Sequence, residues 1–324
     1  MCTAVSWNGG YHYFGRNLDL EYAYQEAVTV TPRNYTFNFR HLPSINEHYA
    51  MIGVATVMEG YPLYYEATNE AGLSMAGLNF PDLAYYAPVC PDKDNVASFE
   101  LIPWILGQCD SVDDAERLLQ QVNITNDAFR EHLMPTPLHW LIADKNRSLT
   151  LEAMSDGLHI LHNPVGILTN NPPFDYHLYH LRSHMQVSPR QAENHFAPEL
   201  DLIPYSNGMG GMGLPGDYSS ASRFVRAAFV KVHSHRRSTE EQDVSQFFHI
   251  LGSVAMPRGS VVMHNGACEI TRYSCCCNTD KGIYYYTTYD NSRITAVELH
   301  GEDLSKDRAI TYPLRTVADF YRQN

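Results

Sequence analysis

The sequence of 324 residues contains no apolar run of about 18 residues, and it begins with neither the basic nor the apolar segment of a secretory signal. We therefore expect no transmembrane helix, no membrane partner and no secretion. The 23 basic residues do not balance the 36 acidic ones, and the resulting charge of −13 excludes a general nucleic-acid binder, because phosphate binding needs a basic surface. No Pro/Ser-rich linker, low-complexity tract or repeat divides the chain, so a single domain is expected over residues 1–324.

The seven cysteines do not indicate a disulfide framework. An odd number of cysteines without a secretory signal is typical of reduced thiols, so we expect a cytoplasmic protein. Three of them are consecutive, Cys275–Cys277, but neighbouring strand residues point to opposite faces, and zinc ligands prefer wider spacings. We expect buried thiols on a strand and no metal site.

The stretch GMGGMG at residues 208–213 matches the dinucleotide fingerprint G-x-G-x-x-G. Pro215 and Gly216 follow it, at the place where the helix that binds the pyrophosphate would have to begin. The stretch is therefore predicted to be a glycine-rich loop.

The order of the expected elements predicts an α+β fold. Short strands are expected throughout the first 80 residues, and helical patterns cover residues 97–121, 219–234 and 243–255, with Ser111 and Asp114 as a capping box. Hairpins rather than βαβ crossovers predict antiparallel sheets, and two groups of helices need two sheet faces. We expect two packed sheets with helices outside. The later strands are predicted in HWLIA, SLTLEAM, LHILH, KGIYYYTTY and RITAVEL.

The first residues carry a possible catalytic arrangement. Removal of Met1 would leave Cys2 with a thiol and a free α-amine on one carbon. A loop at Asn8-Gly9-Gly10 predicts a hairpin in which Cys2 lies opposite Arg16. Arginine favours a thiolate, the amine can relay the proton, and Asp19 could orient the amine. The residues alone leave open that Cys2 is a frayed end and Arg16 a surface charge.

These residues belong to a longer pattern. MCTA and GRNLDLE are followed, in order, by PLYYEATNEAGLSMAGLNFP, NPVGILTNNPPFDY, SSASRFVRAAF and CCNTDKGIYYYTTYDNSRITAV, which together span nearly the whole chain. The pattern resembles the choloylglycine hydrolase family of N-terminal nucleophile hydrolases, and within it the bile salt hydrolases. This resemblance implies a four-layer αββα sandwich, a homotetramer, no cofactor, and conjugated bile salts as substrates.

The resemblance also implies roles for single residues. The implied catalytic residues are Cys2 as nucleophile, Arg16 and Asp19 beside it, Asn79 of GLNFP and Asn171 of LTNNP at an oxyanion hole, and Arg223 of SSASRF completing the polar set. The implied substrate contacts are Arg16, Asn79, Leu20, Phe129 and Met134. Without the resemblance, Asn171 would be interpreted as a turn residue and Arg223 as a charge in the first turn of a helix. A core or surface role for Phe129 and Met134 stays open.

The implied reaction is hydrolysis of the amide that joins a steroid carboxylate to glycine or taurine. Two alternatives remain, a penicillin V acylase of the same fold and a non-catalytic steroid-binding protein. Bile salt hydrolases that resemble this chain carry asparagine at the position of Asn79, whereas typical penicillin V acylases carry tyrosine there. We therefore expect conjugated bile salts to be the better substrates.

Overall fold

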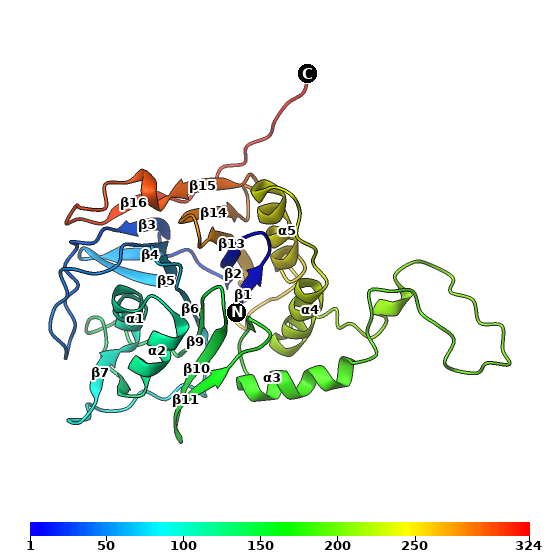
Figure 1. Cartoon of the computed structure of the whole chain (residues 1–324), viewed down its shortest axis with the longest axis horizontal. Coiled ribbons are helices and arrows are strands. Elements are labelled where there is room, and N and C mark those ends of the chain that lie inside the picture. Colours follow the sequence, from blue (N-terminus) through cyan, green and yellow to red (C-terminus); the bar gives the residue numbers. More distant parts are fainter.

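The structure is a computed structural model and describes residues 1–324. Two antiparallel sheets form the centre of the molecule (Figure 1). Every neighbouring pair of strands within these two sheets is antiparallel, as expected from the hairpin pattern. The six-stranded sheet has the order β12 (Ile167–Leu168), β1 (Cys2–Asn8), β2 (His12–Leu20), β13 (Ile270–Asn278), β14 (Ile283–Thr288) and β15 (Thr295–Glu298). The eight-stranded sheet has the order β11 (Gly157–His162), β10 (Ser148–Met154), β9 (Leu138–Ala143), β6 (Ser74–Asn79), β5 (Tyr61–Asn69), β4 (Met51–Met58), β3 (Ala27–Thr31) and β16 (Ile310–Pro313).

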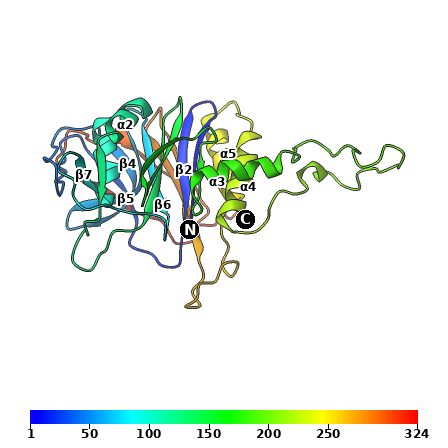
Figure 2. The same ribbon diagram turned by 90° about the horizontal axis from the view of Figure 1, so that it is seen from below.

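Helices cover the outer faces of both sheets, which confirms the predicted αββα sandwich (Figure 2). On the eight-stranded sheet lie α1 (Leu101–Gln108) and α2 (Val112–Leu119), and Ser111 caps α2 by accepting from the amide of Asp114 as predicted. On the six-stranded sheet lie α4 (Ser220–Val232) and α5 (Glu240–Gly252), with α3 (Phe174–His180) beside α4. The remaining elements are the parallel pair β7 (Asp94–Ala97) and β8 (Val122–Thr125) and the 3₁₀ turns η1 (Ser98–Glu100), η2 (Leu181–His184), η3 (Met209–Gly211) and η4 (Leu299–Gly301).

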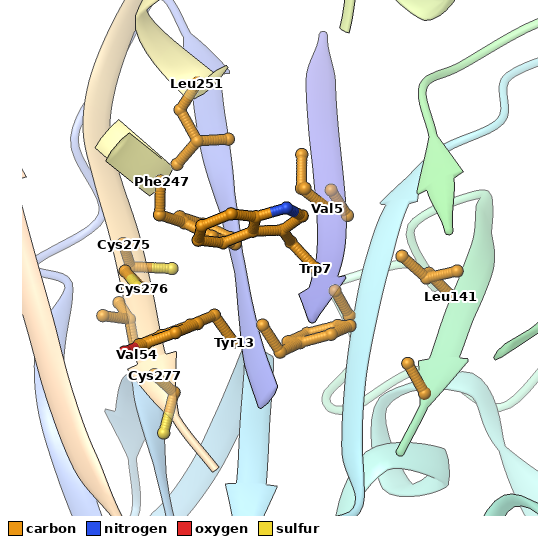
Figure 3. Packing of buried hydrophobic residues seen from close by; sticks show 14 of the residues in the cluster. Val5, Trp7, Tyr13, Val54, Leu141, Phe247, Leu251, Cys275, Cys276 and Cys277 are labelled. Carbon is orange, nitrogen blue, oxygen red and sulfur yellow. The ribbon is translucent and has the colours of Figure 1, made fainter. Parts of the chain in front are cut away.

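The molecule has two hydrophobic cores, as expected for two packed sheets with helices outside. One cluster of 35 buried residues fills the space between the sheets and extends under α4 and α5, and a second of 25 lies between the eight-stranded sheet and α1 and α2. In the first cluster Trp7 stacks on Tyr13 with 5.7 Å between ring centroids (Figure 3). The three consecutive cysteines lie buried on β13 beside them, which confirms the prediction of strand thiols.

The register of the first hairpin differs from the expected one. The loop is Gly9-Gly10-Tyr11, so Cys2 pairs with Leu18 and Arg16 pairs with Ala4. The prediction of Cys2 opposite Arg16 was therefore wrong by two residues. Because side chains alternate with a period of two, this shift leaves the side chains of Cys2 and Arg16 on the same face of the sheet.

A long arm, residues 185–219, leaves the body between η2 and α4 and extends away from it in both views (Figures 1 and 2). The arm contains GMGGMG, which forms a loop with the 3₁₀ turn η3, as predicted. Gly210 is required there, because a Cβ at this position would lie 1.8 Å from the carbonyl oxygen of Arg190. None of the helices is a candidate for crossing a bilayer.

Candidate active site

A cavity of about 420 Å³ opens between the edge of the two sheets and the loops that surround it. Its size lies in the range of pockets that take small organic ligands, and its walls are mostly apolar. Six of the predicted site residues lie on its wall, namely Cys2, Arg16, Leu20, Asn79, Phe129 and Met134. Sequence reasoning did not find the other wall residues, which include Leu18, Tyr24, Tyr65, Phe99, Ile102 and Trp140.

Cys2 is held firmly at the start of β1, with 2% of its surface exposed. Its backbone nitrogen donates to Oδ1 of Asn170 at 2.9 Å, and its carbonyl oxygen accepts from the guanidinium of Arg223. A frayed terminal residue would have neither contact. The structure therefore places the thiol at a fixed point on the cavity wall.

Arg16 is fully buried in the middle of β2 and is not a surface charge. Its Nη1 donates to the carbonyl oxygens of Tyr65 at 3.0 Å and Gly77 at 2.6 Å, and these two residues belong to β5 and β6 of the other sheet. Its Nη2 is buried without a partner. A buried donor that is left unpaired at a cavity wall is available to a ligand.

Asp19 lies next to the chain terminus with one carboxylate oxygen free. Its Oδ1 accepts from the hydroxyl of Thr271 at 2.6 Å, while Oδ2 is buried and has no partner. Burial raises the pKa of Asp19, and the charges of Arg223 and the chain terminus oppose this shift. The α-amine of Met1 donates to the backbone carbonyl of Asp19 at 2.8 Å and pairs with Glu269. Burial lowers the pKa of this amine.

The structure gives Asn170 the contacts that were predicted for Asn171. Oδ1 of Asn170 accepts from the amide of Cys2 and, at 2.6 Å, from Nη2 of Arg223, while its Nδ2 donates to the carbonyl of Asn79 at 2.7 Å. Asn171 instead turns its amide toward the carbonyl of Pro81. The choice of Asn171 is therefore corrected to Asn170.

The segment after β12 explains why the first asparagine points inward. The amide of Asn170 donates to the hydroxyl of Ser220 at 2.8 Å, and its carbonyl oxygen accepts from Nε2 of His177 at 2.9 Å. With both backbone groups fixed, the side chain of Asn170 faces Cys2 and that of Asn171 faces away. Two adjacent asparagines give no sequence signal that distinguishes them, and only the partners from α3 and α4 do so.

Arg223 connects the parts of the site. It lies in the first turns of α4, is fully buried, and donates to the carbonyl of Cys2, the hydroxyl of Thr3 at 2.7 Å and Asn170. Burial lowers the pKa of Arg223, whereas the charge of Asp19 raises it. Two guanidinium groups thus face the position of Cys2, and a site of this kind stabilises a thiolate and any oxyanion formed next to it.

Comparison with known proteins agrees with this geometry. Residues 2–312 match the family described as linear amide C–N hydrolases, choloylglycine hydrolase family. The chain is 51% identical over 324 residues, all of both chains, to a bile salt hydrolase/transferase of Lactiplantibacillus plantarum, and 34% identical over 96% of both chains to one of Clostridium perfringens. A crystal structure of a mutant conjugated bile acid hydrolase from Clostridium perfringens superposes with a TM-score of 0.93 at 32% identity, covering 100% of both chains.

The chain belongs to the choloylglycine hydrolase family and is an amidohydrolase that acts on linear amides. A penicillin V acylase of Agrobacterium tumefaciens shares the fold, with a TM-score of 0.78 at 18% identity over 96% of this chain and 91% of that one.

The contacts of the two asparagines lead to a prediction. Asn170→Ala should lower kcat for amide hydrolysis by about 10²–10³, the usual loss for one polar group that acts on the reacting atoms. Asn171→Ala is the matched control and should change kcat less than about threefold, because its side chain contacts only Pro81. Steady-state kinetics and circular dichroism of both variants test this, and a larger loss in Asn171→Ala than in Asn170→Ala would contradict the correction.

Proposed function

We propose that the protein hydrolyses the amide bond between the steroid carboxyl group and glycine or taurine in conjugated bile salts, with Cys2 as the nucleophile. The observation that carries this proposal is the position of Cys2. Its thiol lies on the wall of an apolar cavity, beside two buried guanidinium groups and an unpaired carboxylate oxygen. A steroid nucleus fits the apolar wall, and the amide carbonyl can then reach the sulfur. We further propose one catalytic unit over residues 1–324.

The nucleophile becomes complete when Met1 is removed. The Cys2 nitrogen is an amide in the chain that carries Met1, and it already lies against Asn170. Cleavage of the Met1–Cys2 bond turns this nitrogen into an amine, which keeps Asn170 as acceptor and gains the free Oδ2 of Asp19 as a second one. The amine then takes the proton of the thiol, so that one residue supplies both nucleophile and base.

In the first half-reaction, the Cys2 thiolate attacks the amide carbon and the carbonyl oxygen becomes an oxyanion. The side chain of Asn79 is half-buried on the cavity wall and makes no hydrogen bond of its own, so its amide can donate to this oxygen. The carbon–nitrogen bond then breaks, the α-ammonium group of Cys2 gives its proton to the leaving nitrogen, and a thioester remains.

In the second half-reaction, water attacks the thioester and the α-amine accepts its proton. Collapse of the second tetrahedral intermediate releases the free bile acid and restores the thiolate. An amine in place of water would instead receive the acyl group, which corresponds to the transferase activity in the names of the relatives from Lactiplantibacillus plantarum and Clostridium perfringens.

The role of Cys2 can be tested directly. Cys2→Ala should remove turnover while the fold persists, and Cys2→Ser should be far slower than the parent enzyme, because a hydroxyl is a poor nucleophile next to a weak base. A preparation that mass spectrometry shows to retain Met1 should also be inactive. A non-catalytic steroid-binding protein would bind glycocholate equally well before and after alkylation of Cys2 and would release no glycine. Turnover by fully substituted Cys2→Ala would exclude this nucleophile.

The pocket wall favours bile salts over penicillin V. Asn79 offers a donor and an acceptor to the polar conjugate, and Leu20, Phe129 and Met134 extend the apolar surface toward the cavity mouth. Met134 lies on the cavity wall and is 70% exposed. A large, mostly apolar wall suits a steroid nucleus better than a small phenoxy group.

We expect kcat/KM for glycocholate and taurocholate to exceed that for penicillin V. Discrimination by apolar contacts is modest, roughly 10–200-fold for a small change, so slow cleavage of penicillin V is expected. Amino-acid and 6-aminopenicillanic acid release by one preparation measures all three rates. If penicillin V is cleaved as fast as either bile salt, the protein is a penicillin V acylase and the proposed bile salt hydrolase function is wrong.

We also propose that the enzyme is a homotetramer of the cytoplasm. All seven cysteines are unpaired, which supports a reducing compartment. The arm exposes an unusual number of large apolar side chains, and such a concentration is typical of a surface that another subunit covers. These side chains are Met185, Phe196, Leu200, Leu202, Ile203, Tyr205 and Met212.

Substitutions in the arm test the assembly. Phe196→Ser combined with Ile203→Ser removes two side chains that are 85% and 74% exposed, and we expect analytical ultracentrifugation to show a smaller species. The matched control is Val317→Ser with Phe320→Ser in the carboxyl-terminal tail, where the side chains are 82% and 81% exposed. A tetramer that persists in the arm variant, or a monomeric parent protein, would contradict this role of the arm.

A further inference from the structure

A buried carboxylate lies between the two sheets, behind the catalytic site. Glu66 is on β5 of the eight-stranded sheet and has 1% of its surface exposed. It accepts hydrogen bonds from the hydroxyl of Tyr273 at 2.7 Å and from that of Tyr284 at 2.6 Å, both on the six-stranded sheet, and from the amide of Val54 at 3.2 Å. Glu66 does not line the cavity.

The fourth neighbour of Glu66 is Arg16. Nε of Arg16 lies 3.8 Å from Oε2 of Glu66, and the side chains of both residues are at most 2% exposed. The other contacts of the guanidinium are backbone carbonyl oxygens, so Glu66 is the carboxylate that it pairs with. Nη2 remains unpaired. Glu66 can therefore reach the reacting atoms only through Arg16.

There is a physical reason for Arg16 and Glu66 to be buried as a pair of opposite charges. A guanidinium group taken out of water needs an anion nearby, because its burial is otherwise very costly. Burial raises the pKa of Glu66, but Arg16 and the two tyrosine hydroxyls stabilise its carboxylate form. Three hydrogen-bond donors and one cation surround the two oxygens, an arrangement that suits an acceptor and not a protonated acid.

We propose that Glu66 is a positioning residue for the hydrolysis proposed above, which orients the guanidinium of Arg16 so that Nη2 stays available beside Cys2. Glu66 lies beside Nε, and the carbonyls of Tyr65 and Gly77 both accept from Nη1, so two of the three guanidinium nitrogens are held. Glu66 also offsets the charge of Arg16. The electrostatic potential at Cys2 therefore depends on the positive charge of Arg16 and the negative charge of Glu66 together.

Several other titratable groups lie near Arg16, Glu66 and Cys2. The test has to separate the effect of Glu66 on Cys2 from the effects of these groups. The groups that face Arg16, Cys2 or Glu66 come from several elements. They are Asp19 on β2, Tyr65 on β5, Tyr273 and Cys275 on β13, Tyr284 on β14, Arg223 on α4, and the chain terminus with Glu269 beside it. All of these are unchanged in Glu66→Gln, which keeps the shape of the side chain and removes one negative charge.

The experiment measures glycocholate hydrolysis and, separately, the pH dependence of Cys2 alkylation by iodoacetamide in the Met1-free enzyme. In Glu66→Gln we expect kcat to fall at least tenfold with KM within threefold. We expect the pH midpoint of alkylation to move down by at least half a unit, because the charge of Arg16 is no longer offset. Glu66→Asp, which restores the charge, should bring the midpoint back toward that of the parent.

Asp243→Asn is the matched control. Asp243 is also a buried carboxylate, 2% exposed, but it accepts from the amides of Gly10 and Arg237 at the far end of the first hairpin. It should lower stability without moving the alkylation midpoint. If Glu66→Gln is folded and has the kcat and midpoint of the parent, Glu66 has no positioning role.

Two further outcomes are distinguishable. If Glu66→Gln does not fold, Tyr284→Phe removes one hydrogen bond to the carboxylate and should lower kcat by about twofold to tenfold, about the net effect of one hydrogen bond. An unchanged kcat in that variant overturns the proposal. If the parent enzyme does not cleave glycocholate, the proposed function fails, but the alkylation midpoints of parent and Glu66→Gln still decide whether Glu66 acts on the surroundings of Cys2.

Discussion

The contacts of Arg223 connect three parts of the chain at the site. Its guanidinium reaches from α4 to the carbonyl of Cys2 and the hydroxyl of Thr3 on β1, and to Asn170 in the segment after β12. Strand β1 begins at the second residue, and the first residues of a chain usually fray unless they are tied down. Here the end is fixed by a buried cation that cannot find equivalent partners elsewhere. The position of the thiol relative to the cavity therefore depends on Arg223 together with Asn170, which accepts from the nitrogen of Cys2.

The same fixation has an energetic cost, since Arg16, Arg223, Asp19 and Glu66 are all removed from water. Buried ions rarely stabilise a fold more than apolar residues of the same size would. Their presence next to a cavity is better explained by the proposed reaction, in which a thiolate and then an oxyanion would form in the same place. A preorganised set of charges stabilises these anions without having to rearrange during each turnover.

Much of the architecture could be predicted from local patterns. Hairpin signals predicted antiparallel sheets, Ser111 was correctly placed as a helix cap, and the three cysteines were correctly placed on a buried strand. The hairpin loop was misplaced by one residue, and the strand register therefore by two, because Asn8-Gly9-Gly10 and Gly9-Gly10-Tyr11 are both acceptable loops. What decides between them is the pairing of β2 with β13, a strand more than 250 residues further along the chain.

The sequence by itself determined the layers of the fold and the kinds of chemical group at the site, because these depend on periodicity, on turn residues and on a pattern of motifs that extends along the chain. Only the tertiary structure decided which of two adjacent asparagines faces Cys2 and that Glu66 lies behind Arg16. The reason is that both facts depend on partners from distant segments: His177 and Ser220 fix the backbone of Asn170, and Tyr273 and Tyr284 hold Glu66 across the two sheets. Neither arrangement leaves a trace in local spacing.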